Sequence, residues 1–409
     1  MAERLSNHLW GRKDSILCVS TYEKGQAFLR ECVRLGCEVT LLTEERLREG
    51  DWPKDILAGF HTMPGVMSLE QVIHTVAWLG RERHIDRIVA LDEFDMETVA
   101  SLREHMRLPG MGASATYLFR DKLAMRVRAA RSGIRVPQFT GVFNYDDLRA
   151  WMAATRAPWV LKPRTQASSL GIRKLHNSEE LWRALETLGD QQSYFVLERF
   201  VPGKVFHVDG IVSEGQVRLA AAHEYGQPPM QLTHEGGVFT TRQMERDAPL
   251  TRRLIEAHRQ VVEAFGMVDG VTHTEYIQAD EDGEIYFLEA AARVGGAFIA
   301  NVIEQSYGVN PWVEWARVEV AAMRGEHYEL PVLQKAYAGS VICLAQQEKP
   351  DTSAYDAPEV VERISKHHHA VLILRSPDEA RVKALLEEYS GRFLREFCAV
   401  LPAPERPTA

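Results

Sequence analysis

The segment at residues 272–296 constrains the fold more than any other part of the chain, because it brings two acidic side chains together on one predicted β-hairpin. Glu275 lies in the first strand pattern, and an Asp- and Gly-rich turn follows at 280–283. Glu289 ends the apolar run that forms the second strand of the hairpin. Two facing carboxylates repel each other and are costly to desolvate unless a cation lies between them. The segment therefore predicts a site for a hard divalent ion, Mg²⁺ or Mn²⁺, that keeps coordination positions for substrate phosphates.

Arg293 follows closely in the sequence and offers a fixed positive group to a phosphate or carboxylate. The alternative is that both glutamates are solvated charges of an ordinary hairpin. The ion site is favoured because Glu289 stands between an apolar run and three alanines, a poor setting for a merely solvated charge.

The remaining patterns predict an α/β fold with three lobes, over residues 1–115, 116–201 and 202–409. The first lobe contains three apolar runs suited to buried parallel strands, at 15–20, 37–43 and 87–92. Its first turn holds a single glycine, so the fingerprint of a dinucleotide-binding fold is missing. Glu93 and Asp95 follow the third run and are either substrate contacts or helix caps.

The second lobe carries the candidates for phosphate binding, after a helical pattern at 116–132. Lys162 ends an apolar strand immediately before a proline, where a lysine must reach solvent or meet an anion. The small-residue loop that follows lets backbone N–H groups approach a phosphate. Taken alone, the lysine and loop also fit an ordinary surface turn. A later strand ends at Glu198 before a Val-Pro-Gly turn, which suits an adenine slot.

Seven segments resemble the ATP-grasp superfamily in their order: RDK with a following Met-Arg, GIRVP, VLKP with its loop, FVLERFVPG, HVDG, HTEY and FLEAAARVGG. They cover about residues 110–296. The resemblance implies an ATP-grasp fold with an N-terminal parallel-sheet pre-ATP-grasp domain. It also implies an ATP-dependent ligase that activates a small carboxylate, such as an amino acid, as an acyl phosphate and joins it to an amine, with release of ADP and phosphate.

The resemblance also implies roles for individual residues. The nucleotide contacts that it implies are Lys122, Lys162, Ser168, Ser169, Gly171, Glu198, Arg199, Phe200, Val201, His207 and Asp209. Glu275 and Glu289 match the metal-binding acids, and Lys162 and Arg293 match residues that steady the transferring phosphoryl group and the acyl phosphate.

The sequence departs from the family at three places, one of which is the phosphate loop, where Ser168 and Ser169 stand in place of a longer glycine run. Many relatives carry Asn two residues after the second metal acid, where this chain has Ala291, so Asn301 is a candidate substitute ligand. Val205 stands where relatives often place an acid.

The polar segment at 223–243 lies where the family lines its substrate site. Arg242 and Arg293 are candidate partners of a substrate carboxylate, Glu224 or Glu235 is a candidate partner of an amino group, and His223 lies within the same segment. The alternative is a surface loop without a substrate.

Composition narrows the class of protein. The net charge of -9 and the lack of a basic tract disfavour a nucleic-acid partner. No apolar run is long enough to cross a membrane, and five cysteines without a CxxC pair predict reduced thiols in a cytoplasmic protein. The resemblance leaves open a homodimer, a biotin-carboxylase-like activation of bicarbonate, and a nucleotide-binding regulatory protein without turnover.

Overall fold

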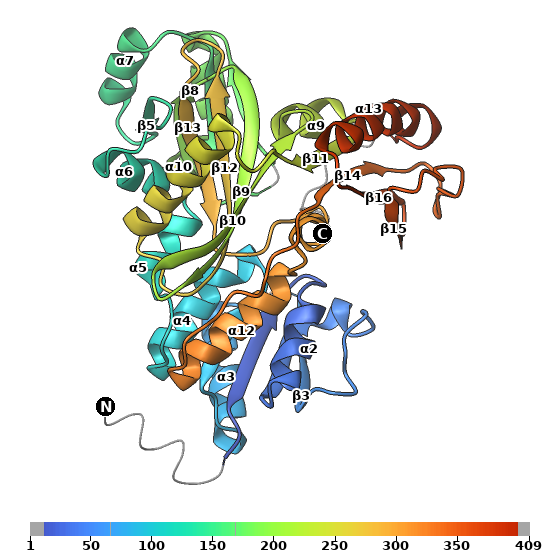
Figure 1. The fold of residues 1–409 in the computed structure, drawn as a ribbon. Helices are drawn as coiled ribbons and strands as arrows, with labels where there is room; N and C mark the ends of the chain where they lie inside the picture. The colour runs from blue at the N-terminus through green and yellow to red at the C-terminus, as the bar shows by residue number, and fades with distance from the viewer. Residues whose placement is uncertain (1–11, 66, 168, 400–409) are drawn as a thin grey trace.

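The computed structural model describes residues 12–65, 67–167 and 169–399, which form three sheets with helices packed between and around them (Figure 1). The N-terminal sheet is parallel, as its three buried apolar runs predict, and its order is β3-β2-β1-β4, in which the less buried β3 is an edge strand that the sequence patterns did not predict. Its strands are β1 (Ser15–Ser20), β2 (Glu38–Glu44), β3 (Gly59–Met63) and β4 (Arg87–Ala90).

Helices cover both faces of this sheet. The helices of the N-terminal lobe are α2 (Gln26–Arg34), α3 (Leu69–Glu82) and α4 (Met96–Met106), with 3-10 turns η1 (Glu45–Leu47) and η2 (Glu93–Asp95). Leu17 and Val19 pack with α3 and α4 in one core cluster, and Ile16 and Cys18 pack with α2 in another. Alternate residues of β1 therefore face opposite layers, and the turn η2 emerges at the carboxyl end of β4.

The central lobe is a small antiparallel sheet with the order β5-β8-β6-β7. Its elements are β5 (Phe139–Gly141), α7 (Tyr145–Ala154), β6 (Trp159–Pro163), β7 (Arg173–Leu175), α8 (Ser178–Leu188), η4 (Gly189–Tyr194) and β8 (Phe195–Arg199). Leu161 and Leu197, on neighbouring strands, pack against Leu148 of α7 and Leu181 of α8. The sheet thus presents its other face to the rest of the molecule.

The helical pattern at 116–132 is not one helix. It divides into the end of α5 (Ala113–Thr116), η3 (Tyr117–Phe119) and α6 (Lys122–Arg131). The side chain of Asp121 accepts hydrogen bonds from the N–H groups of Leu123 and Ala124, so it caps a new helix. This cap places Lys122 at the first position of α6.

The C-terminal lobe is built on an eight-stranded antiparallel sheet with the order β13-β12-β9-β10-β11-β14-β16-β15. The strands are β9 (Gly203–Ser213), β10 (Gln216–Tyr225), β11 (Phe239–Gln243), β12 (Gly270–Ala279), β13 (Ile285–Ala291), β14 (Tyr337–Leu344), β15 (Val360–Lys366) and β16 (His369–Ser376). The helices are α9 (Pro229–Glu235), α10 (Pro249–Phe265), α11 (Ile299–Tyr307), α12 (Pro311–Arg324) and α13 (Glu379–Glu396).

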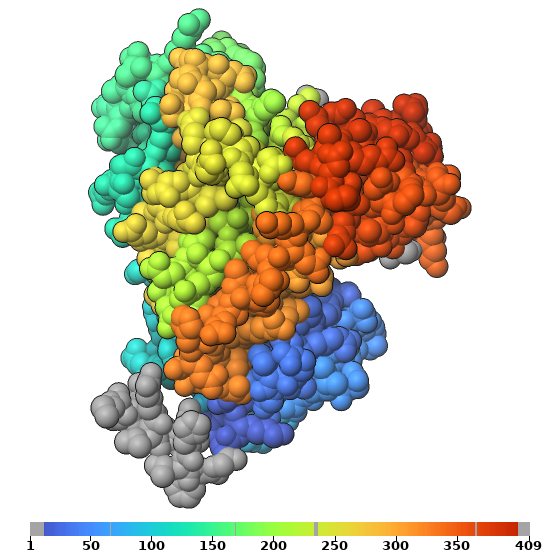
Figure 2. All heavy atoms as spheres, in the orientation of Figure 1, coloured from blue at the N-terminus to red at the C-terminus, as the bar shows by residue number. Residues whose placement is uncertain are grey.

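Helix α12 joins this lobe to the N-terminal lobe, because its Trp315 packs edge-on against Phe28 of α2 with 5.1 Å between the ring centroids. The segment that carries α13 forms a projecting body at the side of the molecule, orange to red in Figure 2. Within the described ranges, no helix combines the length and the apolar character needed to cross a membrane. All five cysteines are free thiols.

Candidate active site

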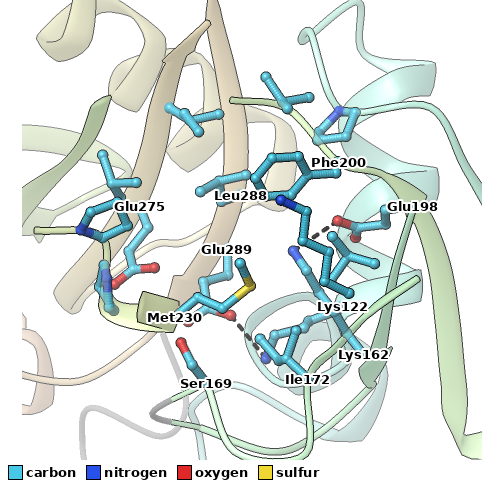
Figure 3. Close-up of a pocket in the computed structure, with 18 of the residues that line it drawn as sticks. Lys122, Lys162, Ser169, Ile172, Glu198, Phe200, Met230, Glu275, Leu288 and Glu289 are labelled. Carbon is cyan, nitrogen blue, oxygen red and sulfur yellow. Dashed lines mark ion pairs between the residues drawn. The ribbon is translucent and has the colours of Figure 1, made fainter. Parts of the chain in front are cut away.

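A cavity of about 670 Å³ lies between the central sheet and the β12–β13 hairpin (Figure 3). Many residues that the sequence marks as nucleotide or metal contacts line it: Lys122, Lys162, Ser169, Glu198, Arg199, Phe200, Val201, Glu275 and Glu289. Ile172, Leu288 and Ile277 add apolar walls, and Met230 of α9 lies at its edge. The cavity therefore combines an apolar slot with the side chains of lysines and glutamates.

The predicted hairpin forms, and its register sets the two carboxylates side by side. Glu275 of β12 is the direct partner of Glu289 on β13, and a bulge follows immediately after Glu275. Directly paired residues project to the same face of a sheet, with Cβ atoms roughly 5 Å apart. Two carboxylates in that arrangement reach a common ion, so the pair suits Mg²⁺, which takes few protein ligands.

Glu275 is held in its ionised form. Its Oε1 atom accepts a hydrogen bond of 2.9 Å from the hydroxyl of Tyr225. Burial raises the pKa of Glu275, but the His273 imidazole and the Tyr225 hydroxyl more than offset this, and the net pKa lies below its ordinary value. An ionised carboxylate is the form that binds a divalent cation.

Lys122 connects the hairpin to the loop that follows β6. Its Nζ atom lies 2.8 Å from Oε2 of Glu289 and donates a 2.6 Å hydrogen bond to the carbonyl of Gln166. The helix cap at Asp121 fixes where this side chain starts. Lys122 is therefore positioned between a candidate metal ligand and the candidate phosphate loop.

Lys162 shares a buried carboxylate with an arginine that the sequence did not single out. Its Nζ atom lies 2.8 Å from Oε2 of Glu198, and Nη2 of Arg126 lies 2.9 Å from Oε1 of the same group. Burial raises the pKa of Glu198, but the positive charges of Arg126 and Lys162 lower it by more. The net pKa lies below its ordinary value, so the carboxylate is charged. The Arg126 guanidinium has no exposed surface and also donates to the carbonyl of Leu288.

The loop after β6 turns back toward the cavity. Ser169 has a positive φ of 57°, and Gly171 has a φ of 71°. A Cβ atom on Gly171 would lie 2.9 Å from Cγ of Pro163, so glycine suits both the backbone and the space. Ser169 lines the cavity, Gly171 supports the turn behind it, and Ser168 lies outside the described residues.

Arg293 stands apart from the cavity lining and is held by the N-terminal lobe. Its Nε atom donates to Glu93 of η2, and Glu93 also accepts a 3.0 Å hydrogen bond from Arg120. Burial raises the pKa of Glu93, but the Arg293 and Arg120 guanidinium groups outweigh it and lower the pKa to about 2. Arg120 in turn donates a 2.8 Å hydrogen bond to the carbonyl of Thr165 in the loop after β6. Glu93 is thus neither a simple helix cap nor a free cleft residue.

Two of the predicted nucleotide contacts lie elsewhere. His207 and Asp209 are buried in the large sheet, where Nδ1 of His207 lies 2.6 Å from Oδ2 of Asp209. Burial, opposed by Asp209, lowers the pKa of His207 to about 4. Neither side chain lines the cavity, because neighbouring strands and the segment after Arg293 enclose them.

The predicted substrate residues do not gather at the cavity either. His223 has no exposed surface and lies beside His207, with 4.7 Å between the ring centroids. Arg242 pairs with Glu224 and with Glu379 of α13, at a separate cavity of about 530 Å³. The side chain of Glu235 lies outside the described part of the structure.

The proposed substitute metal ligand is also directed away from the hairpin. Asn301 of α11 donates a 2.8 Å hydrogen bond from its side-chain amide to Glu362 of β15. That contact joins α11 to the projecting C-terminal body. Among the described residues, the candidate magnesium ligands are thus the two glutamates.

Residues 155–301 match the ATP-grasp domain family. The chain contains an ATP-grasp domain. The matched region includes Lys162, Glu198, both hairpin glutamates and Arg293, while Lys122 lies outside it.

Curated relatives of this chain are ligases by name. The chain is 26% identical over 242 residues to the L-arginine-specific L-amino acid ligase of Bacillus subtilis, and the match covers 58% of each chain. It is 26% identical over 265 residues to an alanine–anticapsin ligase of Bacillus subtilis, covering 59% of this chain and 55% of that one. The matched regions therefore span less than two thirds of these relatives.

Solved structures share the ATP-grasp arrangement over nearly the whole chain. An L-amino acid ligase from Bacillus licheniformis superposes with a TM-score of 0.75 at 18% identity, covering 95% of this chain and 99% of that one. A biotin carboxylase from Campylobacter jejuni superposes with a TM-score of 0.69 at 16% identity, covering 94% and 92%. The predicted ATP-grasp fold is confirmed.

Proposed function

We propose that this chain is an ATP-dependent ligase that converts a small carboxylate, an amino acid, to an acyl phosphate and joins it to an amine. The observation that carries the proposal is the meeting of Glu275 and Glu289, in direct register, with Lys122 and Lys162 in one cavity. Two carboxylates for a cation and two ammonium groups for phosphates are what a site needs to hold a nucleotide triphosphate with its metal ion.

Each wall of the cavity has a part in the reaction. Phe200, Val201 and Leu288 form an apolar slot for adenine, and the backbone of the β8 turn offers its polar groups. Lys122 and Lys162 balance the charge of the phosphates. Glu275 and Glu289 would hold Mg²⁺, which supplies positive charge to the phosphate oxygens when bound.

The chemistry proceeds in two steps. A carboxylate oxygen of the substrate attacks the γ-phosphorus, the bond to the β-phosphate oxygen breaks, and ADP leaves. The amine nitrogen then attacks the carbonyl carbon, the carbon–oxygen bond to phosphate breaks, and phosphate leaves as the amide forms and the amine loses a proton. Arg293 lies outside the cavity lining, and we assign to it the stabilisation of negative charge on the transferring phosphoryl group because the family resemblance implies that role.

The arrangement around Arg293 supports this role. Glu93 and Arg120 fix the guanidinium from the N-terminal lobe, and Arg120 also holds the carbonyl of Thr165 in the phosphate loop. Holding a charged group in place before the reaction lowers the cost of reorganisation during it. The acyl phosphate also requires exclusion of water, and Gln166, Ser169 and Leu170 of the loop after β6 line the cavity.

The relatives point to the substrate class. The ligase named for L-amino acids, the alanine–anticapsin ligase, and a D-alanine–D-alanine ligase of Trichlorobacter lovleyi that is 25% identical over 229 residues support an amino acid as the carboxylate. The acceptor is then an amine, which includes a second amino acid.

The test is phosphate release from MgATP across pools of amino acids, other small carboxylates, amines and bicarbonate, with ADP and AMP separated. ADP formation that needs an amino acid and an amine together is the expected result. ADP formation with bicarbonate alone would replace the proposal with a carboxylase-like reaction. ATP binding without ADP from any pool would indicate a regulatory nucleotide-binding protein.

A further inference from the structure

A row of buried polar side chains lies directly behind Glu275 on the same face of the large sheet. The register pairs Glu275 with His207 and His273 with Asp209 across β12 and β9. Residues two apart on a strand face the same side, so these four side chains form one patch. Apart from Glu275, which reaches the cavity, each is at most 7% exposed.

Close polar contacts link the side chains of this patch and lead from Asp209 through His273 to Glu275. Nδ1 of His273 lies 2.9 Å from Oδ1 of Asp209. Its Nε2 atom lies 3.3 Å from the hydroxyl of Tyr225 and 3.7 Å from Oε1 of Glu275. Tyr225 in turn donates to Glu275 over 2.9 Å. The His273 ring therefore spans the distance between a fully buried carboxylate and the candidate metal ligand.

The second oxygen of Asp209 is also engaged. It lies 2.6 Å from Nδ1 of His207, whose Nε2 atom lies 2.7 Å from Oγ1 of Thr241. The chain of contacts thus runs across β12, β9 and β11. An aspartate that is held at both oxygens has little freedom to rotate, and it therefore fixes the orientation of the His273 imidazole that contacts it.

The same cluster has the composition of a metal site. One ligand atom from each of His207, Asp209 and His273 lies within 4.8 Å of the others. The hydrogen bonds account for them without an ion, because each oxygen of Asp209 already faces one imidazole nitrogen. A buried polar group with a partner at each atom is stable as it stands.

The segment that carries Arg293 rests on this cluster. A Cβ atom placed on Gly295 would lie 2.8 Å from Oδ1 of Asp209 and 3.1 Å from Nδ1 of His273. Contacts that short require a neighbour to move, and the neighbours are this buried pair and Cγ2 of Ile299, at 3.0 Å. The adjacent Gly296 has nothing within 4 Å of its Cβ position, so it provides a matched control.

We propose that Asp209 and His273 are positioning residues that hold Glu275 in the orientation required to bind the metal ion, and that Gly295 keeps the Arg293 segment seated on the same pair. The proposal rests on the proposed role of Glu275 as a metal ligand. Outer partners that orient a ligating group typically change metal affinity by about 10- to 100-fold when they are removed.

The experiment measures Mn²⁺ binding to the full chain in the presence of ADP, by the electron paramagnetic resonance signal of free Mn²⁺. The affinity for ADP without metal, in EDTA, is measured in parallel. Asp209→Asn and Gly295→Ala are expected to weaken Mn²⁺ binding about 10-fold or more, with metal-free ADP affinity unchanged. Gly296→Ala is expected to match the parent protein in both measurements.

Glu275→Gln distinguishes failure of the metal site from failure of the positioning role. If Glu275→Gln leaves Mn²⁺ binding intact, the proposed metal site itself fails. If Glu275→Gln weakens binding but folded Asp209→Asn and Gly295→Ala do not, the positioning role is wrong and the metal site stands. Gly295→Ala decides the question where Asp209→Asn does not fold. One equivalent of zinc in the purified protein, lost in Asp209→Asn, would overturn the hydrogen-bonded arrangement in favour of a resident ion.

Discussion

Replacing Lys162 with methionine is expected to weaken nucleotide binding without unfolding the protein. Lys162 lies 2.8 Å from Glu198, and its removal leaves that buried carboxylate with Arg126 at 2.9 Å. The carboxylate is therefore not left without a partner, and the stability loss stays below the roughly 3–5 kcal/mol of an unpaired buried charge. A charge-assisted contact to phosphate is worth about 1.5–3 kcal/mol. The expected loss of ATP affinity is thus about 10- to 100-fold.

Calorimetric titration with a non-hydrolysable ATP analogue and Mg²⁺ measures this loss, and thermal unfolding checks the fold. Lys204→Met is the matched control, because the Lys204 side chain is 72% exposed and lies 3.7 Å from Glu224 in a surface pair worth little. Unchanged analogue affinity in folded Lys162→Met would refute the assignment of Lys162 to the phosphates. An equal loss in Lys204→Met would show that net charge, not the site, governs binding.

Three further substitutions test other parts of the structure. Glu289→Gln is expected to lower Mg²⁺-dependent kcat at least about 100-fold while metal-free ADP affinity, measured by titration in EDTA, stays near that of the parent. Burial raises the pKa of Asp95 to about 7 from an ordinary 3.8. The folded state therefore binds the Asp95 proton more tightly than the unfolded state does. The stability that this proton contributes is complete below about pH 4 and is lost as the pH rises through about 7. The free energy of unfolding of the parent protein, measured in urea, should therefore fall by on the order of 4 kcal/mol across that window, and Asp95→Asn should lack this fall. If Asp95→Asn shows the same fall as the parent protein, another group is responsible for it. Arg126→Met should lower the free energy of unfolding by about 3–5 kcal/mol, whereas Arg131→Met, at an exposed position of the same helix, should change it by about 0.5 kcal/mol or less; similar losses in both would remove the special role of the buried guanidinium.

Local patterns were enough to predict the parallel sheet and the acidic hairpin. Strands of a parallel sheet are buried on both faces, so their apolar runs stand out in the sequence, as β1 does. The turn at 280–283 separates two strand patterns, and this brings the two strands together as an antiparallel pair. The direct pairing of Glu275 with Glu289 depends in addition on the bulge after Glu275, which no local pattern in the sequence marks.

The ion pairs that organise the site could not be predicted in the same way. Arg126 and Glu198 are separated by 72 positions, and Arg293 and Glu93 by 200. Nothing in either local sequence selects the partner, because the pairing depends on how three lobes pack. Sequence reasoning proposed Glu93 as a substrate contact or a cap, but its partner Arg293 becomes visible only in three dimensions.

The resemblance implies that His207 contacts the nucleotide, but the structure has His207 away from the cavity, and the cause is similar. Its strand was marked by a family segment, and strand alternation shows which side chains share a face but not what covers that face. Here the segment after Arg293 covers it. The long β9–β10 hairpin did leave a local signal, since Glu214 and Gly215 form a turn with positive φ at both residues between apolar strands.

The charge pattern of the cavity implies an order to ligand binding. Lys122 pairs with Glu289, and Lys162 pairs with Glu198. A metal ion approaching alone must displace the Lys122 ammonium from Glu289 and leave it beside a second cation, which costs energy in a buried site. A nucleotide with its metal ion provides both partners at once, because the phosphates receive the lysines as the cation takes the carboxylates. Mg²⁺ and nucleotide are therefore expected to bind with positive cooperativity, and Lys122→Met should reduce this cooperativity by strengthening metal binding in the absence of nucleotide.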